Sequence, residues 1–274
     1  MVRKKDGGWR MCVDYRRLNS VTKFDCFPLP CLDEALDAFA GATVFSSLDL
    51  AMEYHQVFVK PADVEKTAFI THVGLYEMKK NPFGLCNAPS TYQRLMMSVL
   101  QGLIGRICLA YLDNVIVFSK RRVEHVNDLR AVLDRIRDAG LKLKPPKCKL
   151  FCEQVLYMGQ VISPAGVSTD PAKLRVLADW PVPTTVRELE SFLGFVNFYS
   201  DFIDEQTALT SSLYNLTAAR KRTEPVHFSR EDIERFTKLK RRLCAAPCLA
   251  HRNLEAPFTL YTDASKVVVG AVLL

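Results

Sequence analysis

The 274-residue sequence predicts an α+β fold, and three observations support this. Short apolar runs separated by turn residues fill the first third of the chain. From about residue 163 the pattern changes to amphipathic helices with clear start signals, and after Pro247 strand-like runs return at 258–262 and 267–274. These changes place soft boundaries near residues 165 and 225.

Composition and charge narrow the class of protein. Hydrophobic residues make up 49% and charged residues 24%, which is typical of a globular chain. No apolar run reaches the ~20 residues that cross a bilayer, and the N-terminus lacks the apolar core of a signal peptide. We therefore expect neither an integral membrane protein nor a secreted one. The net charge of +7 favours a polyanionic partner only slightly.

The nine cysteines do not form a metal-binding pattern. No Cys-x-x-Cys pair occurs, and the close pairs Cys148/Cys152 and Cys244/Cys248 have no histidine at zinc-finger spacing. We expect reduced thiols in an intracellular protein.

Local patterns predict the elements before residue 165. Apolar runs rich in β-formers predict strands at 9–15, 43–50, 54–59 and 74–80. Asn87-Ala-Pro predicts the start of a helix that carries Tyr92 and Met96 at helical spacing. A second helix is expected at about 124–139, with Gly140 as its stop.

Capping signals predict three helices after residue 163. The signals are Asp170 before Pro171, Thr185 with Glu188, and Ser229 with Asp232.

The segment 107–119 is the most informative. Two apolar, β-rich runs flank Tyr111-Leu112-Asp113-Asn114, so we predict a hairpin whose turn presents the carboxylate of Asp113 to a cation. Asp49 ends another apolar run, where a carboxylate is costly unless it caps a turn, pairs or binds a metal. Taken singly, each is more often an ordinary turn aspartate.

The segments around these two residues resemble, in order, the motifs of reverse transcriptases. The matching segments are 9–19 (fingers), 45–56 (first palm motif), 81–96 (template grip), 111–113 (Tyr-x-Asp-Asp hairpin) and 140–163 (end of the palm). Segments 180–194 and 262–265 are similar to the thumb and the linked ribonuclease H of gypsy-class long-terminal-repeat retrotransposon polymerases.

The resemblance implies a right-hand polymerase. Partial fingers and the palm are expected at 1–165, a helical thumb at 166–225, and a connection with a truncated ribonuclease H-like β-hairpin at 226–274. The implied activity is RNA-directed DNA polymerisation for a retroelement, with two Mg²⁺ ions for which Mn²⁺ can substitute. The implied partners are a primed RNA or DNA template, deoxynucleoside triphosphates and other segments of a Pol polyprotein, but no membrane. The implied location is the cytoplasm, in virus-like particles of the parent element.

The resemblance also assigns roles to single residues. Asp49 and Asp113 would bridge both metal ions, with the backbone carbonyl of Leu50. The nucleotide-binding residues would be Lys4, Lys5, Arg10, Tyr54 as a gate against ribose, and Phe83 and Gly84 beneath the new base pair. Asp263 would be a remnant of the ribonuclease H site. Without the resemblance, Arg10 is equally an exposed strand charge, and Tyr54 and Phe83 are typical of core aromatics.

Three positions depart from the family pattern. Asn114 stands where the family has the second Asp of the hairpin, and a neutral amide binds Mg²⁺ far less well, so a rate loss of about 100-fold or more is expected. Glu53 replaces a small residue and would repel the triphosphate, and Asn81 replaces an apolar residue. We expect an impaired polymerase; the alternative is a catalytically inactive nucleic-acid-binding remnant or a decayed retrotransposon fragment.

Both ends look short against the family pattern. We expect the chain to begin after an upstream fingers segment and to end before most acidic residues of ribonuclease H. No RNA-cleaving activity is therefore expected.

Overall fold

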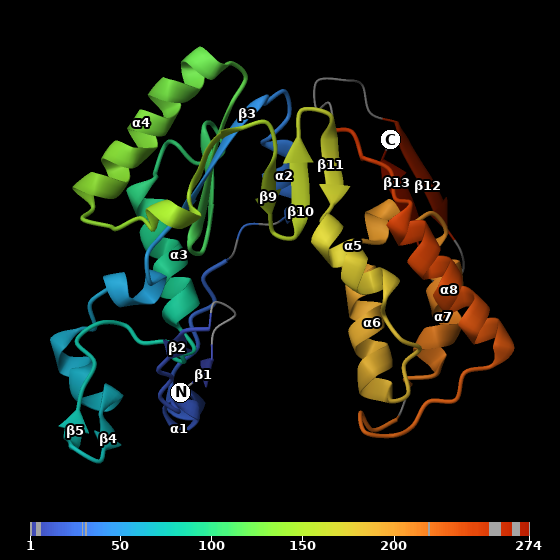
Figure 1. Ribbon diagram of the computed structural model, residues 1–274, viewed down its shortest axis with the longest axis horizontal. Coiled ribbons are helices and arrows are strands. Elements are labelled where there is room, and N and C mark those ends of the chain that lie inside the picture. Colours follow the sequence, from blue (N-terminus) through green and yellow to red (C-terminus); the bar gives the residue numbers. More distant parts are fainter. Residues whose placement is uncertain are drawn as a thin grey trace.

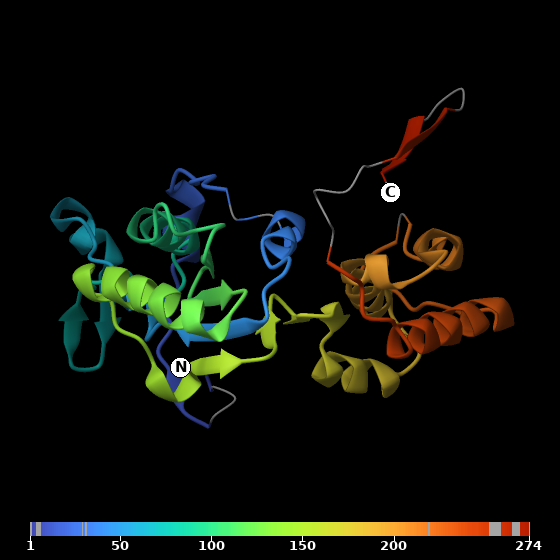
Figure 2. The ribbon, with the colours of Figure 1, turned by 90° about the horizontal axis from the view of Figure 1, so that it is seen from above.

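The computed structural model describes residues 2–3, 7–28, 30, 32–218, 220–251, 259–264 and 269–273. A mixed lobe with most of the strands stands beside a lobe of four helices, and three short strands lie between the two (Figure 1). Seen from above, the last hairpin stands off from the helices (Figure 2).

The mixed lobe is built on an antiparallel sheet in the order β6-β7-β3-β8. The strands are β3 (Val44–Asp49), β6 (Cys108–Tyr111), β7 (Asn114–Ser119) and β8 (Lys149–Cys152). Their side chains alternate between two cores: Val115 and Val117 of β7 belong to one, and Ile116 and Phe118 to the other. Because both faces of β7 are covered, Val115–Phe118 form a continuous apolar run rather than alternating with polar residues.

The first core lies beneath two helices, α3 (Ala88–Val99) and α4 (Arg122–Asp138). Tyr92 and Met96 of α3, and Leu129, Val132 and Ile136 of α4, are buried in it. The helical spacing predicted from the sequence is therefore confirmed for both helices. Val126 of α4 is 43% exposed, whereas its neighbour His125 is fully buried.

The second core continues from the sheet into the helical lobe. It joins α2 (Leu32–Asp37) and the sheet β11-β10-β9 to the four helices of the helical lobe. The elements are β9 (Val155–Tyr157), β10 (Gln160–Ser163), β11 (Gly166–Thr169), α5 (Pro171–Ala178), α6 (Val186–Phe198), α7 (Gln206–Asn215) and α8 (Arg230–Cys244). The two lobes thus share a buried core, which fixes the helical lobe against the mixed lobe.

The remaining elements are short. They are β1 (Val2–Arg3), β2 (Trp9–Arg10), α1 (Arg16–Val21), β4 (Phe69–Thr71), β5 (Gly74–Tyr76), β12 (Leu260–Ala264), β13 (Val269–Leu273), and the 3₁₀ turns η1 (Glu53–Gln56), η2 (Pro61–Thr67), η3 (Pro145–Lys147) and η4 (Ser200–Phe202).

Several strand predictions are wrong in whole or in part. The strand expected at 9–15 ends at residue 10, and the one expected at 74–80 ends at residue 76. The apolar run at 54–59 begins instead as the turn η1, which the Gln56 amide fixes by donating to the carbonyls of Ala51 (2.7 Å) and Lys142 (3.1 Å). This long-range contact overrides the local β pattern.

The capping predictions are mostly confirmed. The carboxylate of Asp170 accepts from the amide of Ala172, and Ser229 and Asp232 form a complete capping box. Thr185 accepts from the amide of Glu188, but the Glu188 carboxylate accepts from the amide and hydroxyl of Thr184. No helix in the described ranges is long and apolar enough to span a membrane.

Candidate active site

The hairpin β6–β7 brings the two predicted carboxylates to one edge of the palm sheet. Its two-residue turn is Leu112-Asp113, and Asn114 pairs directly with Asp49 across the sheet. The amide of Leu50 donates to the carbonyl of Asp113 at 3.1 Å, which ties the end of β3 to the turn.

Leu112 has a φ of +51°, which primed hairpin turns require but which a side chain disfavours. Gln93 of α3 stabilises this backbone. Its side-chain carbonyl accepts from the amide of Leu112 (2.8 Å), and its amide donates to the carbonyl of Ala110 (3.0 Å). Gln93 is fully buried, so both bonds are shielded from water.

A cavity of about 270 Å³ opens above this edge. Its lining residues are Trp9, Met11, Val13, Asp49, Leu50, Met52, Glu53, His55, Met78, Pro82, Phe83, Asp113, Lys144 and Lys147. Segments from five parts of the chain therefore meet at the two aspartates. The lining of the cavity is partly apolar and partly charged. Most of its apolar residues come from segments 9–13 and 78–83.

Lys147 of η3 forms an ion pair with Asp49, with Nζ 3.0 Å from Oδ2. The carboxylate of Asp49 raises the pKa of Lys147, and Asp113 and Glu53 add to this effect. All three carboxylates thus act on one ammonium group.

Phe83 lines the cavity, and the ring of Tyr54 lies against it from the side of the first core. Their ring centroids are 5.2 Å apart, and the Tyr54 ring also packs 6.0 Å from that of Tyr92. Burial raises the pKa of Tyr92, and Glu53 and Asp113 raise it further, so its phenol stays protonated. Phe83 lines the cavity, whereas Tyr54 packs partly into the first core, so the two predicted residues differ in exposure to the site.

Gly84 lies where the loop before α3 meets the fingers. Its φ is +103°, and a Cβ there would stand 3.2 Å from the carbonyl of Val13. The side-chain NH2 of Asn19 donates to the backbone carbonyl of Gly84, and the side-chain oxygen of Asn19 accepts from the backbone amide of Cys86. The glycine is thus required by the protein backbone itself.

Some predicted residues lie outside what the structure describes. These are Lys4 and Lys5, and the side chains of Arg10 and Asp263, whose backbones lie in β2 and β12. Their roles stay predictions. The eight described cysteines are free thiols, and Cys31 is outside the described residues.

Residues 2–162 match the family model described as reverse transcriptase (RNA-dependent DNA polymerase). The chain belongs to this reverse transcriptase family. Residues 228–274 match a second model, described as an RNase H-like domain found in reverse transcriptase.

Curated relatives of this reverse transcriptase chain are retrotransposon proteins. It is 37% identical over 265 residues to the retrovirus-related Pol polyprotein from transposon 297 of Drosophila melanogaster, covering 97% of the chain and 25% of that protein. It is 34% identical to the Transposon Tf2-7 polyprotein of Schizosaccharomyces pombe, covering 99% and 20% respectively. The chain therefore spans about a quarter of the length of these relatives.

Solved structures of foamy viral protease-reverse transcriptase share the fold. One, in complex with double-stranded DNA, has a TM-score of 0.88 and 23% identity, over 96% of this chain and 46% of that one. Another, in complex with an RNA/DNA hybrid, has a TM-score of 0.83 and 22% identity, over 96% and 35%. The right-hand polymerase fold predicted from the sequence is confirmed.

The donors at the hairpin suit a divalent cation. In the described part of the chain no three His, Cys, Asp or Glu side chains are already grouped as a metal site. Mg²⁺, however, commonly binds through one or two carboxylates together with substrate phosphates. Asp49, Asp113 and the Leu50 carbonyl supply oxygen donors of this kind. Asn114 instead accepts from the hydroxyl of Ser47 at 3.1 Å.

The sequence analysis missed Gln93, Lys144 and Lys147 as site residues. Gln93 carries a detectable signal, because it is polar and sits between Tyr92 and Met96 on an apolar helix face. Lys147 is separated by 98 positions from its partner Asp49, so no local pattern reveals the pair.

Proposed function

We propose that this chain is the polymerase part of a retroelement Pol protein and extends a primer on an RNA template by two-metal nucleotidyl transfer. The observation that carries this is the convergence of Asp49 and Asp113 in one cavity of a reverse transcriptase fold. The proposed substrates are a primed template and deoxynucleoside triphosphates. Relatives solved with double-stranded DNA and an RNA/DNA hybrid support a nucleic-acid partner.

The residues of the cavity suit this reaction. When bound, divalent ions would stabilise the attacking and leaving oxygens. Asp49 and Asp113 would hold those ions, and Gln93 keeps the turn of Asp113 in place. Lys144 and Lys147 bring positive charge to the side where a triphosphate would lie. Trp9, Met11 and Phe83 offer apolar surface for the nucleobase and exclude water.

The proposal includes a slow reaction rate. Asn114 lies opposite Asp49 and binds Ser47, so the hairpin offers one carboxylate instead of two. Glu53 lines the same cavity and would repel the triphosphate. Both features weaken binding of the substrate and its metal without changing the fold.

Primer extension on an RNA template tests the proposal. The parent chain, Asn114→Asp and Asp113→Asn are compared under the same conditions. We expect slow extension by the parent, about 100-fold faster extension by Asn114→Asp, and none by Asp113→Asn. Blank-level rates for both the parent and Asn114→Asp would contradict polymerase activity and leave nucleic-acid binding alone.

A further inference from the structure

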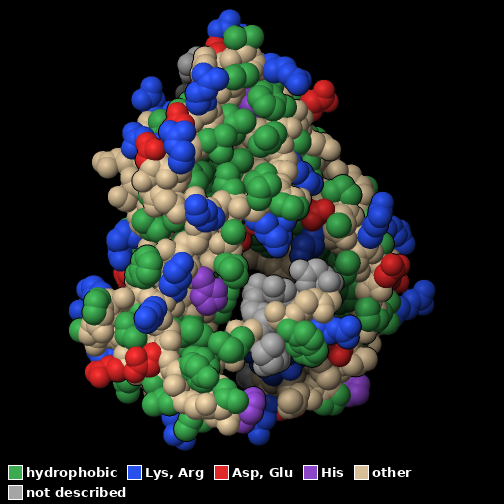
Figure 3. All heavy atoms as spheres, turned by 60° about the vertical axis from the view of Figure 1, so that its left-hand side comes forward, with side chains coloured by type: hydrophobic (Ala, Val, Ile, Leu, Met, Phe, Trp, Pro, Cys, Tyr) green, Lys and Arg blue, Asp and Glu red, His purple; other side chains and the backbone are tan. Residues whose placement is uncertain are grey.

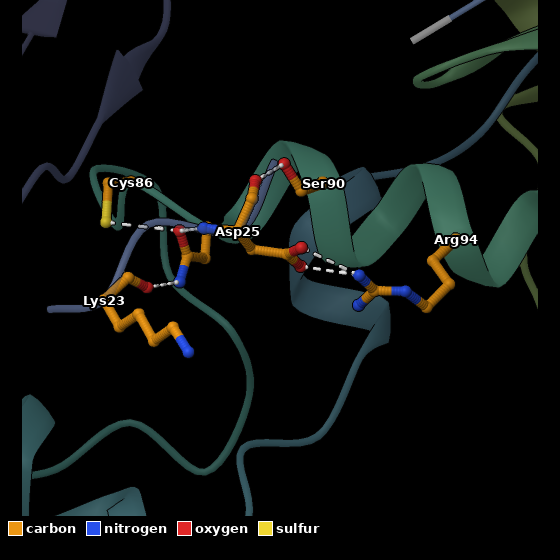
Figure 4. A network of polar contacts seen from close by, with 6 residues as sticks. Lys23, Asp25, Cys86, Ser90 and Arg94 are labelled. Atoms are coloured by element: carbon orange, nitrogen blue, oxygen red, sulfur yellow. Dashed lines mark hydrogen bonds and ion pairs between the residues drawn. The ribbon is translucent and has the colours of Figure 1, made fainter. Parts of the chain in front are cut away.

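A segment between α1 and the palm runs along helix α3 and is fixed to it. We call residues 23–27 the strap. The side-chain amide of Asn87 donates to the carbonyl of Lys23 (2.9 Å), and its oxygen accepts from the amide of Asp25 (3.0 Å). One turn further, the hydroxyl of Ser90 donates to the carbonyl of Asp25 at 3.0 Å (Figure 4).

Arg94 completes this set of contacts with a charged pair. One terminal guanidinium nitrogen lies 2.8 Å from both carboxylate oxygens of Asp25 (Figure 4). The guanidinium also lies over the ring of Phe27, 4.7 Å from its centroid. The Arg94 side chain is 51% exposed, so the pair contributes little to stability by charge alone. Because Arg94 contacts two residues of the strap, we expect it to fix the orientation of the strap against α3 more than to raise the free energy of unfolding.

The buried side of the same helix contacts the turn of Asp113. Asn87, Ser90 and Arg94 are spaced i, i+3, i+7 and share one face, which meets the strap. Gln93, the neighbour of Arg94, lies about 100° further round the helix, is buried and binds the amide of Leu112, next to Asp113. Helix α3 therefore makes a specific side-chain contact to both the strap and the turn.

We propose that Arg94 and Asp25 are positioning residues that set the register of α3 between the strap and the hairpin, so that Gln93 holds the turn of Asp113. This inference rests on the proposed function. The strap follows α1, whose Asn19 is bonded to Gly84 and Cys86 in the loop before α3. Displacement of the fingers segment would thus reach the turn through one rigid helix.

Amide hydrogen exchange at Leu112 tests the inference without requiring catalysis. In Asp25→Asn and Arg94→Lys we expect the Leu112 amide to exchange about fivefold faster, because the Gln93 bond is weakened. Gln93→Ala should give a larger increase. Asp63→Asn is the matched control, because Asp63 forms a 2.6 Å ion pair with Lys66 in the fingers. It should leave the Leu112 amide unchanged.

Two further measurements distinguish a positioning role of Asp25 and Arg94 from a purely local stabilisation of the strap. Asp25→Asn/Arg94→Lys should exchange no faster at Leu112 than either single variant, since both remove one interaction. In primer extension the single variants should lower kcat with little change in the nucleotide KM. Faster exchange in the strap amides with no change at Leu112 would overturn the inference. Failure of primer extension in the parent, with faster Leu112 exchange in both single variants, would contradict only the proposed function.

Discussion

At the scale of single residues, the proposed metal site predicts opposite effects of Asn114 on stability and on metal binding. It faces Asp49 across the sheet and stands next to Asp113, so its neutrality removes a like-charge contact. Asn114→Asp should therefore lower the free energy of unfolding by up to about 1 kcal/mol without divalent ions.

Millimolar Mg²⁺ should reverse that loss, because it binds the folded state only. Thermal unfolding of Asn114→Asp with and without Mg²⁺ measures this. Asn127→Asp makes the same charge change on the exposed side of α4 and serves as the control. A Mg²⁺ effect of equal size in both variants would argue against a metal site at the hairpin.

A buried histidine of helix α4 contacts strands β3 and β7. His125 Nε2 lies 2.7 Å from Ser46 Oγ, and Nδ1 lies 2.9 Å from Ser119 Oγ. Because the Ser119 hydroxyl donates to Asp128 at 2.6 Å, it can accept only from Nδ1–H, which leaves Nε2 as the acceptor from Ser46. The bonds therefore specify one neutral tautomer of His125.

The pH dependence of stability should follow from this. Burial lowers the pKa of His125 below its usual 6.5, although Asp128 opposes the shift. Above pH 6.5 both folded and unfolded states hold a neutral ring; as pH falls through 6.5 only the unfolded state gains the proton, so stability decreases. Urea unfolding between pH 8 and pH 5 should show a smaller decrease in His125→Gln than in the parent. His72→Gln, at an exposed position, should match the parent.

At the scale of elements, the capping box of α8 is the most complete helix signal. The Ser229 hydroxyl accepts from the amide of Asp232, whose carboxylate accepts from the amide of Ser229 at 3.1 Å. Ser229→Ala should lower the free energy of unfolding by about 1 kcal/mol. Thr237→Ala, which removes a hydroxyl bonded within the same helix, should change it by less than about 0.5 kcal/mol. Equal losses, measured by urea unfolding, would show that the cap is not a specific stabilising feature.

These elements also show what the sequence can predict. The helix predicted at about 124–139 is α4 at 122–138, and α3 and α8 begin directly after the predicted start residues Asn87 and Ser229, because start signals and a 3.6-residue period are both local. The strand predicted at 54–59 begins instead as η1, where Gln56 binds the distant Lys142, and the strand predicted at 9–15 ends at residue 10.

The candidate site also contains residues that the sequence predicts and residues that it does not. Asp49 and Asp113 could be predicted because each ends or joins an apolar strand in a recognisable motif. The partners that hold them, Lys147 and Gln93, depend on how separate segments pack. The sequence therefore predicts the two carboxylates, and the fold shows that they meet in one cavity and which side chains contact them.

At the scale of the whole molecule, a shared core and a surplus of basic residues suit a long polyanion. The second core runs from the sheet β6-β7-β3-β8 to α8, so the mixed lobe and the helical lobe are held together by one set of buried side chains. The face in Figure 3 is hollowed near its centre, and Lys and Arg side chains stand beside the hollow. With a net charge of +7, phosphates rather than bases should supply most of the affinity.

Binding of a primed duplex should therefore weaken steeply with salt. If two or more phosphates are neutralised, the affinity should fall by about tenfold or more between 50 and 200 mM salt, because the condensed counterions are no longer released favourably. Fluorescence anisotropy with labelled duplexes of two unrelated sequences should give the same slope, since backbone contacts do not read sequence. A duplex with an uncharged backbone should bind weakly and without salt dependence. Affinity for the charged duplex that does not change with salt would contradict a phosphate-tracking surface, because counterion release would then make no contribution.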